Sequence, residues 1–406
     1  MPWFEWSSLF IRWFHVIAGV AWIGASFYFI WLDNNLRPPP DSKKQQGIKG
    51  DLWSVHGGGF YEIGKYEYGP QQMPEKLHWF KWEAYSTWLS GALLLGLIYY
   101  YGAAIYLIDP AVMVFTPGEA IRRGIGLIFG GLFIYEAACR SPLGRYPALF
   151  GVFLLVMLAV ASFLATHWFS GRGAFMHVGA LVGTIMAGNV FFKIMPAQRL
   201  MVAAVANKQA IDPAWGQAAK LRSVHNNYLT LPLLFIMISN HYPITFQHPQ
   251  SWLVLLMIGV VSAWIRHYFN LKHLGISRPS ILITGAIGML VITAWVSMPQ
   301  GQNSNVEQIA NPNTSTSQPL TNEQQQVFAI IQRHCSNCHS AAPTDELFVV
   351  APMGLMLDNW PQVQLRAAQI YQRAAVSKDM PLMNKTGMSK KERQVIASWF
   401  VKQTAH

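Results

Sequence analysis

Long apolar segments dominate the first 300 residues of the chain. Eight of them are long enough to cross a hydrocarbon core of about 30 Å, which requires about 20 residues of helix. They cover approximately 9–32, 84–108, 120–138, 147–168, 174–195, 226–244, 251–270 and 279–298. The third, with Glu136 near its end, and the sixth, which contains Pro232, are the least regular. Because lipid offers the backbone no hydrogen-bond partners, the sequence predicts an all-α, polytopic membrane bundle of about eight transmembrane helices.

The composition divides the chain into a membrane part and a soluble part. Only 12% of the residues are charged, against about 25% in soluble domains. Of the 16 tryptophans, 14 lie before residue 301. We therefore expect a membrane domain at 1–298 with a large loop at 34–81, a polar linker at 299–320 and a small soluble domain at 321–406. In the last of these, Thr321 and Ser389 are candidate helix N-caps.

The net charge of +11 is explained by basic loops and does not require a nucleic-acid partner. Lys and Arg concentrate in the loops after the first, third, fifth and seventh apolar segments and are sparse in the others. The positive-inside rule then places both termini on the outer side. In a bacterium the protein would lie in the inner membrane, with the N-terminus and the C-terminal domain in the periplasm and the lipid bilayer as its first partner.

The soluble domain contains the motif Cys335-Ser336-Asn337-Cys338-His339. C-x-x-C-H is the attachment signal for haem c, in which the two thiols bind the haem and the histidine ligates the iron. A thioredoxin-like redox pair would lack the histidine. A zinc site would need a second ligand pair, and the third cysteine, Cys139, is distant. The motif therefore predicts one covalent haem c in a class I-like cytochrome c domain, attached through Cys335 and Cys338 and ligated by His339.

Met380 is the best candidate for the second iron ligand. It precedes Pro381, and small c-type cytochromes commonly place the axial methionine in a Met-Pro context. A thioether ligand raises the reduction potential, which suits an electron acceptor. Methionine also fills hydrophobic cores, so other methionines are rivals, namely Met353, Met356, Met383 and Met388.

Histidines inside or at the ends of apolar segments are candidates for function, because ionisable groups are costly in a membrane. His15, His167, His177 and His241 all fall toward the predicted outer side. One interpretation is a non-covalent haem b, or a substrate site, held by His15, His177 or His167. The alternative is structural hydrogen bonding or an interfacial position. The stretches that begin at His15 and His177 match at 7 of 15 positions, which suggests two parallel four-helix repeats.

The large loop and the segment after it carry a second group of candidates. The loop contains His56, a run of three glycines and Glu62, and Glu83 stands at the start of the second apolar segment. Glycines can expose N–H donors to an anion, although a flexible turn would equally explain the run. We treat His56, Glu62 and Glu83 as candidate catalytic residues.

Several long motifs resemble one known family. WSVHGGGFYEIGKY, WFKWEAYSTWLSGALLLG, CRSPLGRYP and FMHVGALVGTIMAGNVFFKIMPAQ, followed by CSNCH, are similar to the bacterial membrane-bound cytochrome c urate oxidases, the PuuD family. The resemblance covers essentially the whole chain. It implies oxidation of urate to 5-hydroxyisourate in purine catabolism, with electrons passing to haem c and on to a respiratory cytochrome c or terminal oxidase.

Two other functions fit parts of the sequence. A cytochrome subunit that relays electrons from a quinol would also use histidine, glutamate and aromatic residues between its spans. A transporter would fit the parallel repeats, but a tethered haem c has little use there. Reduction of the haem by urate, as opposed to quinol, separates the first two functions.

Overall fold

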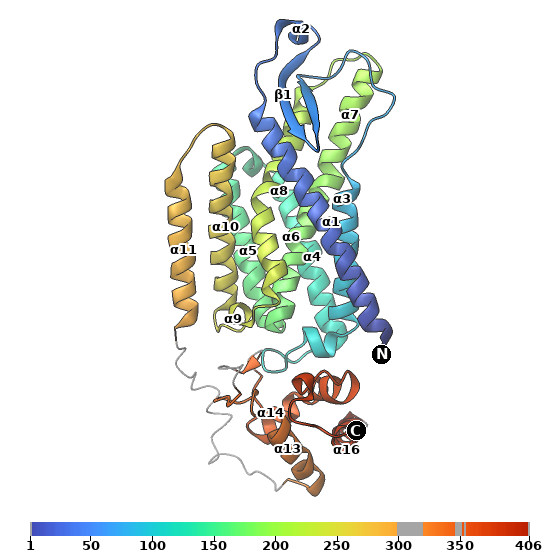
Figure 1. Cartoon of the computed structure of the whole chain (residues 1–406), viewed down its shortest axis with the longest axis vertical. Helices are drawn as coiled ribbons and strands as arrows, with labels where there is room; N and C mark the ends of the chain where they lie inside the picture. The colour runs from blue at the N-terminus through green and yellow to red at the C-terminus, as the bar shows by residue number, and fades with distance from the viewer. Residues whose placement is uncertain (1, 299–319, 346–350, 353–354, 405–406) are drawn as a thin grey trace.

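The computed structural model describes residues 2–298, 320–345, 351–352 and 355–404 (Figure 1). Long helices stand side by side in a bundle, and the C-terminal residues form a separate group beyond one end of it. The predicted linker at 299–320 lies outside the described residues except for Leu320. Met353, one of the rival iron ligands, also lies outside them.

Each predicted apolar segment contains a long helix. These helices are α1 (Pro2–Asn35), α3 (Trp82–Leu94), α4 (Pro117–Arg140), α5 (Pro147–Trp168), α6 (Gly171–Asn189), α8 (Pro213–Ser239), α10 (Ser251–His273) and α11 (Pro279–Ser297). The π-helical turns η1 (Leu95–Tyr100) and η2 (Ala103–Leu107) follow α3, and η4 (Val190–Ile194) joins α6 to α7 (Met195–Ala206). Short turns η3 (Pro142–Arg145) and α9 (Pro243–Phe246) lie in the connections.

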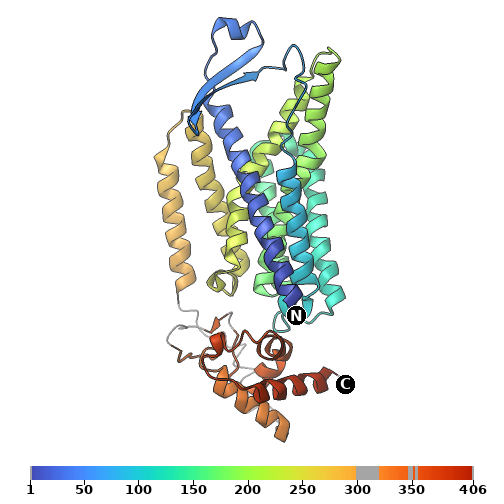
Figure 2. The same cartoon turned by 45° about the vertical axis from the view of Figure 1, so that its right-hand side comes forward.

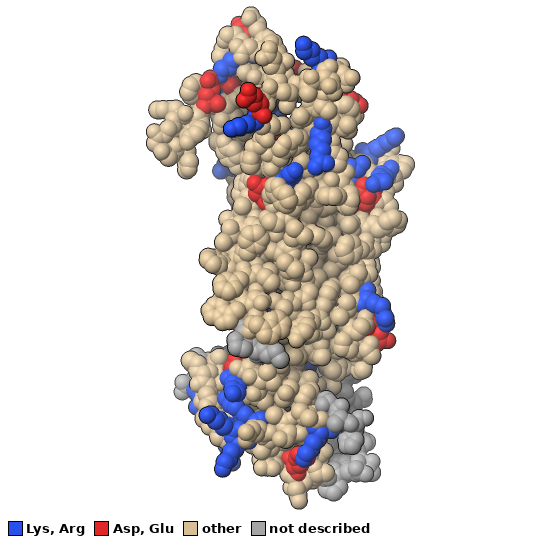
Figure 3. Space-filling view, turned by 90° about the vertical axis from the view of Figure 1, so that its right-hand side faces the viewer, with Lys and Arg blue, Asp and Glu red and all other residues tan. Residues whose placement is uncertain are grey.

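Five of these helices have the length and composition of a membrane span: α1, α5, α6 together with α7, α10 and α11. The other three differ for local reasons. The π-helical turn η1 interrupts α3, and α4 and α8 contain charged residues. On the face that Figure 3 shows, charged side chains gather toward the two ends and leave a broad uncharged belt between them. These features are those of a multi-pass membrane protein.

Polar residues extend two of the helices beyond the predicted apolar segments. The sixth segment was expected to begin at 226, but α8 begins at Pro213, where the Asp212 side chain accepts a hydrogen bond from the backbone of Ala214 at 2.8 Å. The fifth was expected to end at 195, but the helix continues to Ala206. Hydropathy detects only the apolar part of a helix, so polar extensions escape it.

The large loop contains the only strands in the described part of the chain. After the short helix α2 (Asp41–Lys44), β1 (Ile48–His56) and β2 (Gly59–Tyr66) form an antiparallel hairpin. Gly57 and Gly58 have φ of 58° and 84°, as a two-residue type I′ turn requires. A hairpin turn therefore explains the glycine run, and the all-α prediction is wrong for this segment.

The C-terminal residues form a small helical domain of their own. Its elements are α13 (Asn322–His334), α14 (Trp360–Leu365), α15 (Ala367–Ile370), η6 (Tyr371–Val376), η7 (Leu382–Asn384) and α16 (Lys390–Thr404). Thr321 forms a capping box with Gln324, as its position suggested. Ile331 and Ile396 are fully buried between α13 and α16, and the rings of Trp360 and Trp399 pack in the same core at an angle of 58° to one another.

The two ends of the bundle carry different structures. The first turns of α1 and the C-terminal domain lie at one end, and the hairpin projects from the other (Figures 1 and 2). We call these the domain end and the hairpin end. The basic hairpin loop and the C-terminal domain are thus separated by the length of the bundle.

Candidate functional site

A cavity of about 1540 Å³ runs along the bundle, bordered chiefly by α1, α3, α6 and α8. Its walls are mostly apolar and include Trp22, Trp79 and Trp88. From α1 alone the lining residues extend from Arg12, toward the domain end, to Asp33 at the hairpin end. At 1.5 Å per residue this stretch is roughly 30 Å long. The cavity therefore extends along most of the length of α1.

His15 faces this cavity from α1 and is held in place by α3. Its Nδ1 lies 3.0 Å from the carbonyl oxygen of Thr87 and 2.9 Å from Oγ of Ser90. A neutral imidazole with its proton on Nδ1 donates to the Thr87 carbonyl, which leaves the Nε2 lone pair available. His15 is therefore oriented as a proton acceptor or a ligand at the cavity wall.

His177 is in a different environment from His15, although the sequence pairs them. It is fully buried, its Nδ1 lies 2.8 Å from the carbonyl oxygen of Gly173, and it does not line the cavity. Phe169 packs on the ring with centroids 4.7 Å apart. A Cβ built on Gly124 of α4 would lie only 2.6 Å from Nε2. Nε2 of His177 thus faces Gly124 of α4, and it is buried without a hydrogen-bond partner. A haem ligated by His177 stays a prediction.

The other predicted residues are scattered. Glu83 lines the cavity near the hairpin end, with Oε1 4.0 Å from Nε2 of His78. His56 and Glu62 lie on the exposed hairpin and do not line the cavity, and Glu62 pairs with Lys43. His167 is exposed at the end of α5. The structure therefore brings Glu83 and His15 to one cavity but leaves His56, Glu62 and His167 outside it.

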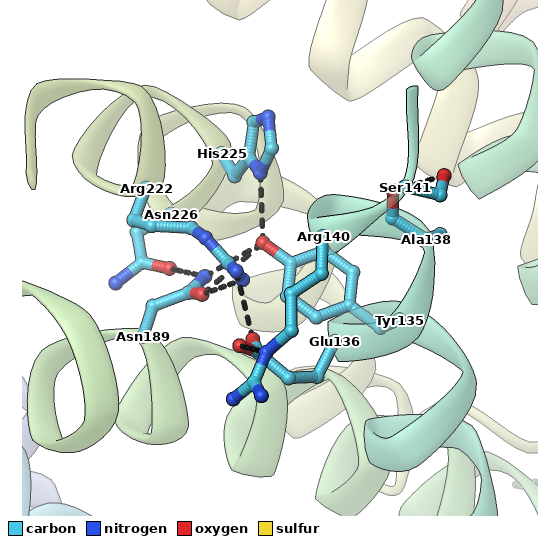
Figure 4. A network of polar contacts seen from close by, with 9 residues as sticks. All are labelled: Tyr135, Glu136, Ala138, Arg140, Ser141, Asn189, Arg222, His225 and Asn226. Carbon is cyan, nitrogen blue, oxygen red and sulfur yellow. Dashed lines mark hydrogen bonds and ion pairs between the residues drawn. The ribbon is translucent and has the colours of Figure 1, made fainter. Parts of the chain in front are cut away.

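A buried polar network connects α4, α6 and α8 (Figure 4). Arg222 is 4% exposed and pairs with Glu136 at 2.7 Å, and its Nη1 donates to Oδ1 of Asn189 at 2.9 Å. The Tyr135 hydroxyl lies 2.7 Å from Nδ1 of His225. The Asn189 amide donates to Oδ1 of Asn226 at 2.8 Å.

Each residue drawn in this network has a partner, so its main role is to join three helices. The sequence analysis placed Arg222 in a basic loop. Its four-residue spacing from Asn226, a polar residue inside an apolar segment, could have indicated that both lie on one buried helix face.

The C-x-x-C-H motif directly follows α13. Cys335 and Cys338 are unpaired thiols. Burial raises the pKa of the Cys335 thiol to about 12 and also raises that of Cys338. A redox C-x-x-C pair needs a lowered thiol pKa, so these cysteines do not have the character of a thioredoxin-like site.

His339 has the orientation that iron ligation needs. Its Nδ1 lies 3.0 Å from the carbonyl oxygen of Leu355, and burial lowers the imidazole pKa. The neutral ring donates through Nδ1 and keeps the Nε2 lone pair for a metal, which is the usual arrangement of a histidine ligand. The donor set of two thiols and one oriented imidazole fits a covalently attached haem.

The methionines differ in how well they could serve as the second ligand. The Met380 carbonyl accepts a hydrogen bond from Arg393 at 2.7 Å, and its side chain is partly buried. Met383 is 84% exposed, whereas Met388 is 3% exposed within the core. Met356 is also partly buried. Met380 stays the predicted ligand.

The C-terminal domain contacts the bundle beside the domain end of the cavity. Arg366 pairs with Asp109 at 2.8 Å, and their side chains are 15% and 17% exposed. The side-chain amide of Gln369 donates to the carbonyl oxygen of Ile105 at 3.3 Å. Ile105 and Asp109 lie just after the π-helical turn that carries the cavity residues Tyr99 and Tyr100. Ile105 is five positions after Tyr100, so a short stretch of backbone connects the cavity wall to the docked domain.

Comparison with known proteins identifies the bundle. The family described as Urate oxidase N-terminal matches residues 2–297, which is the whole membrane part of the chain. No curated protein and no solved structure matches the chain significantly.

Substituting Gly124 should test the tight packing around His177. In Gly124→Ala the new methyl group would meet His177 Nε2 at 2.6 Å and the Tyr100 hydroxyl at 3.2 Å. Overpacking of this kind costs about 1–3 kcal/mol, so the thermal midpoint of the detergent-solubilised protein should fall. Gly126→Ala, on the same helix with nothing within 4 Å, should not lower the midpoint, because alanine is the better helix former. Equal midpoints for the two variants would contradict this packing.

Glu392 should make the stability of the C-terminal domain depend on pH. Hydrogen bonds from the Ser389 backbone and side chain, and then from His334, lower the Glu392 pKa to about 2 from an ordinary 4.5. The lowered pKa stabilises the folded domain fully above about pH 4.5. This contribution to the free energy of unfolding is lost as the pH falls from about 4.5 toward about 2.

Calorimetry of the full-length protein between pH 6 and about 2.5 should show this loss. The gap between the unfolding midpoints of wild type and Glu392→Gln should narrow as the pH falls. Glu323→Gln is the control, because it removes a carboxylate that forms only an exposed ion pair with Lys402. Such pairs contribute little to stability, so the midpoint of this variant should stay close to that of wild type. A gap for Glu392→Gln that stays constant with pH would exclude the lowered pKa.

Proposed function

The chain belongs to the Urate oxidase N-terminal family, and we propose that it oxidises urate within the membrane bundle and passes the electrons to haem c in its C-terminal domain. The product would be 5-hydroxyisourate. The electrons would then leave through a soluble or membrane cytochrome c and a terminal oxidase. This is the function of the membrane-bound cytochrome c urate oxidases that the sequence motifs resemble.

The cavity is the observation that carries the proposal. Urate is a planar purine with one negative charge near neutral pH, and it needs aromatic surfaces, cationic groups and a proton acceptor. The cavity offers Trp88, Arg12, Arg172 and His15 along its wall. Its volume of about 1540 Å³ exceeds the roughly 300–1,000 Å³ of an ordinary small-molecule site. Substrate would therefore occupy one part of it and use the remainder as a passage.

The reaction requires proton acceptors and an exit for electrons. The urate monoanion and one water molecule give the 5-hydroxyisourate monoanion, two protons and two electrons. A new C–O bond forms at the purine, the water loses a proton, and a ring N–H loses the other. His15 can accept a proton on Nε2 because its Nδ1–H is bound to the Thr87 carbonyl. Protonated His15 would keep the same orientation through this bond.

The C-terminal domain supports the second half of the proposal. Cys335 and Cys338 would hold the haem, and His339 and Met380 would ligate its iron. Haem c, when bound, accepts one electron at a time, so each urate requires two transfers. A non-covalent haem b held by His15, His177 or His167 stays a prediction.

The arrangement of the two ends supports a location in the bacterial inner membrane. The start of α1 and the C-terminal domain lie at the domain end, and the lysine-bearing hairpin lies at the other (Figure 2). With the hairpin in the cytoplasm, both ends of the chain would face the periplasm, where haem c is attached. We propose that α3, α4 and α8 cross the membrane beside the other five spans.

Urate should reduce the protein without oxygen. Mixing urate anaerobically with the oxidised full-length protein should produce the absorption bands of reduced haem c. His15→Ala should slow this reduction by about 10²–10⁴-fold, the usual contribution of a proton acceptor. Stopped-flow absorbance measures both rates.

His167→Ala is the matched control, because His167 is exposed and does not line the cavity. It should keep the wild-type rate. Reduction by a quinol but not by urate would instead make the protein a quinol-linked cytochrome and would refute urate oxidation.

The contact between Arg366 and Asp109 should control electron transfer from the bundle to the haem domain. Arg366→Glu removes the ion pair and places two acidic groups together. The rate of haem reduction by urate should fall about tenfold, as expected when about 1.4 kcal/mol of docking free energy is lost. The double variant Arg366→Glu with Asp109→Lys should recover most of the rate.

Arg373→Glu provides the same charge change at a pair within the C-terminal domain, because Arg373 contacts Asp379. It should leave the rate near that of wild type. If the two single variants behave alike, or if the double variant shows no recovery, the Arg366–Asp109 contact does not set the rate.

A further inference from the structure

Two arginines line the domain end of the cavity without an acidic partner. Arg12 lies on α1 and Arg172 in the first turn of α6. Neither forms an ion pair with a carboxylate in the part of the chain that the structure describes. The Tyr99 hydroxyl lies against Arg172 and is also within the electrostatic influence of Arg12. Two cations thus face one end of a mostly apolar cavity.

The position of Arg172 makes this excess positive charge unfavourable in the absence of an anion. A helix carries a partial positive charge at its N-terminus, which destabilises cations in the first turn. Arg172 is the second residue of α6. A guanidinium held there is stabilised best by a bound negative charge.

Unpaired polar atoms surround the same place. The Nε of Arg172 is buried without a hydrogen-bond partner, and the Tyr99 hydroxyl lies against Arg172. The Tyr100 hydroxyl, which is also buried without a partner, lies beside Gly124 and His177. Tyr99 is 4% exposed, yet it belongs to the cavity wall. Buried polar groups in proteins are nearly always paired, so a cluster of exceptions calls for an explanation. A polar ligand that enters this end of the cavity provides one.

His15 completes the arrangement. It lies three residues after Arg12 on α1, so both side chains occupy the same face of the helix. Both line the cavity. A ligand held by Arg12 would therefore lie within one helical turn of the proposed proton acceptor.

We propose that Arg12 and Arg172, with the hydroxyl of Tyr99, form a binding pocket for a planar purine monoanion at the domain end of the cavity. This inference rests on the proposed function and locates its substrate. The arginines bind the anionic edge of the ring, and the Tyr99 hydroxyl donates to one of its carbonyl oxygens. His15 takes the proton of a ring N–H.

The pocket also lies next to the electron exit. Tyr99 and Tyr100 belong to η1, and five residues later the Ile105 carbonyl contacts Gln369 of the C-terminal domain. A purine at this end is therefore close to the docked domain, whereas one at the hairpin end would be separated from it by the length of the bundle.

Lipid phosphate is the competing partner for arginines near a membrane surface. The structure favours the purine, because a snorkelling arginine extends its head into water, whereas the Nε of Arg172 is buried in the protein. An arginine that bound only headgroups would also have no reason to line the cavity.

Equilibrium dialysis with labelled urate tests the pocket directly. The full-length protein is held fully reduced with dithionite, so that urate binds without being oxidised. Arg12→Gln and Arg172→Gln should each raise the dissociation constant about tenfold to a hundredfold, which corresponds to about 1.4–2.8 kcal/mol. Arg172→Lys keeps the charge but loses the planar fork and should show a smaller effect.

Arg122→Gln is the matched control, because Arg122 is exposed on the first turns of α4 at the same end and does not line the cavity. It should leave urate binding unchanged. Thermal unfolding without urate distinguishes ligand binding from a structural role. Since neither arginine has an acidic partner, the two Gln variants should unfold no earlier than wild type. Urate should raise the midpoint of wild type but not theirs.

The possible results distinguish a failure of the proposed pocket from a failure of the proposed function. Unchanged urate binding in both Gln variants overturns the pocket, and the proposed function survives if urate still reduces the wild-type haem. Early unfolding of both variants without urate also overturns it, because the arginines would then be structural. A wild-type protein that neither binds urate nor is reduced by it refutes both proposals.

Discussion

The cost of an unpaired polar group inside the bundle organises the rest of the structure. Within the uncharged belt a polar side chain can pair only with another part of the protein or with a ligand. Arg222 meets this requirement with Glu136 and Asn189, and so joins three helices. Arg12 and Arg172 do not meet it within the described residues. The same residue type therefore serves as scaffold in one place and as a binding group in the other, and pairing distinguishes the two.

The helices could be predicted from sequence because the property that buries them in lipid is the one that hydropathy measures. The prediction was least accurate where polar residues are paired inside the protein. The first turns of α8, which contain Arg222, were assigned to a loop because the partners that compensate this charge lie on α4 and α6. The hairpin was missed for a different reason. A Gly-Gly turn between two short strands is a recognisable signal, but the glycines were interpreted as a possible anion-binding site and not as a hairpin turn.

The candidate site was predictable only in part. His15 stands out in the sequence as an ionisable residue inside a span, and its contact with Thr87 agrees with a functional role. His177 shows the same signal, but α4 covers its ring nitrogen at Gly124, which no sequence pattern reveals. Arg12 was not singled out, because an arginine near the end of a span usually reaches toward lipid headgroups. Only the three-dimensional structure shows that it lines a cavity together with Arg172.

The length of the cavity bears on how electrons and substrate share the bundle. Electron tunnelling weakens steeply with distance, whereas a small molecule diffuses along an open passage at little cost. A substrate that entered at the hairpin end and reacted there would require cofactors across roughly 30 Å, the length of α1 that lines the cavity. A substrate that moves to Arg12 and Arg172 before it reacts requires only a short transfer past Ile105 to the docked domain. The passage then performs the task that a second haem would otherwise have, and a fully covered His177 is no obstacle to the reaction.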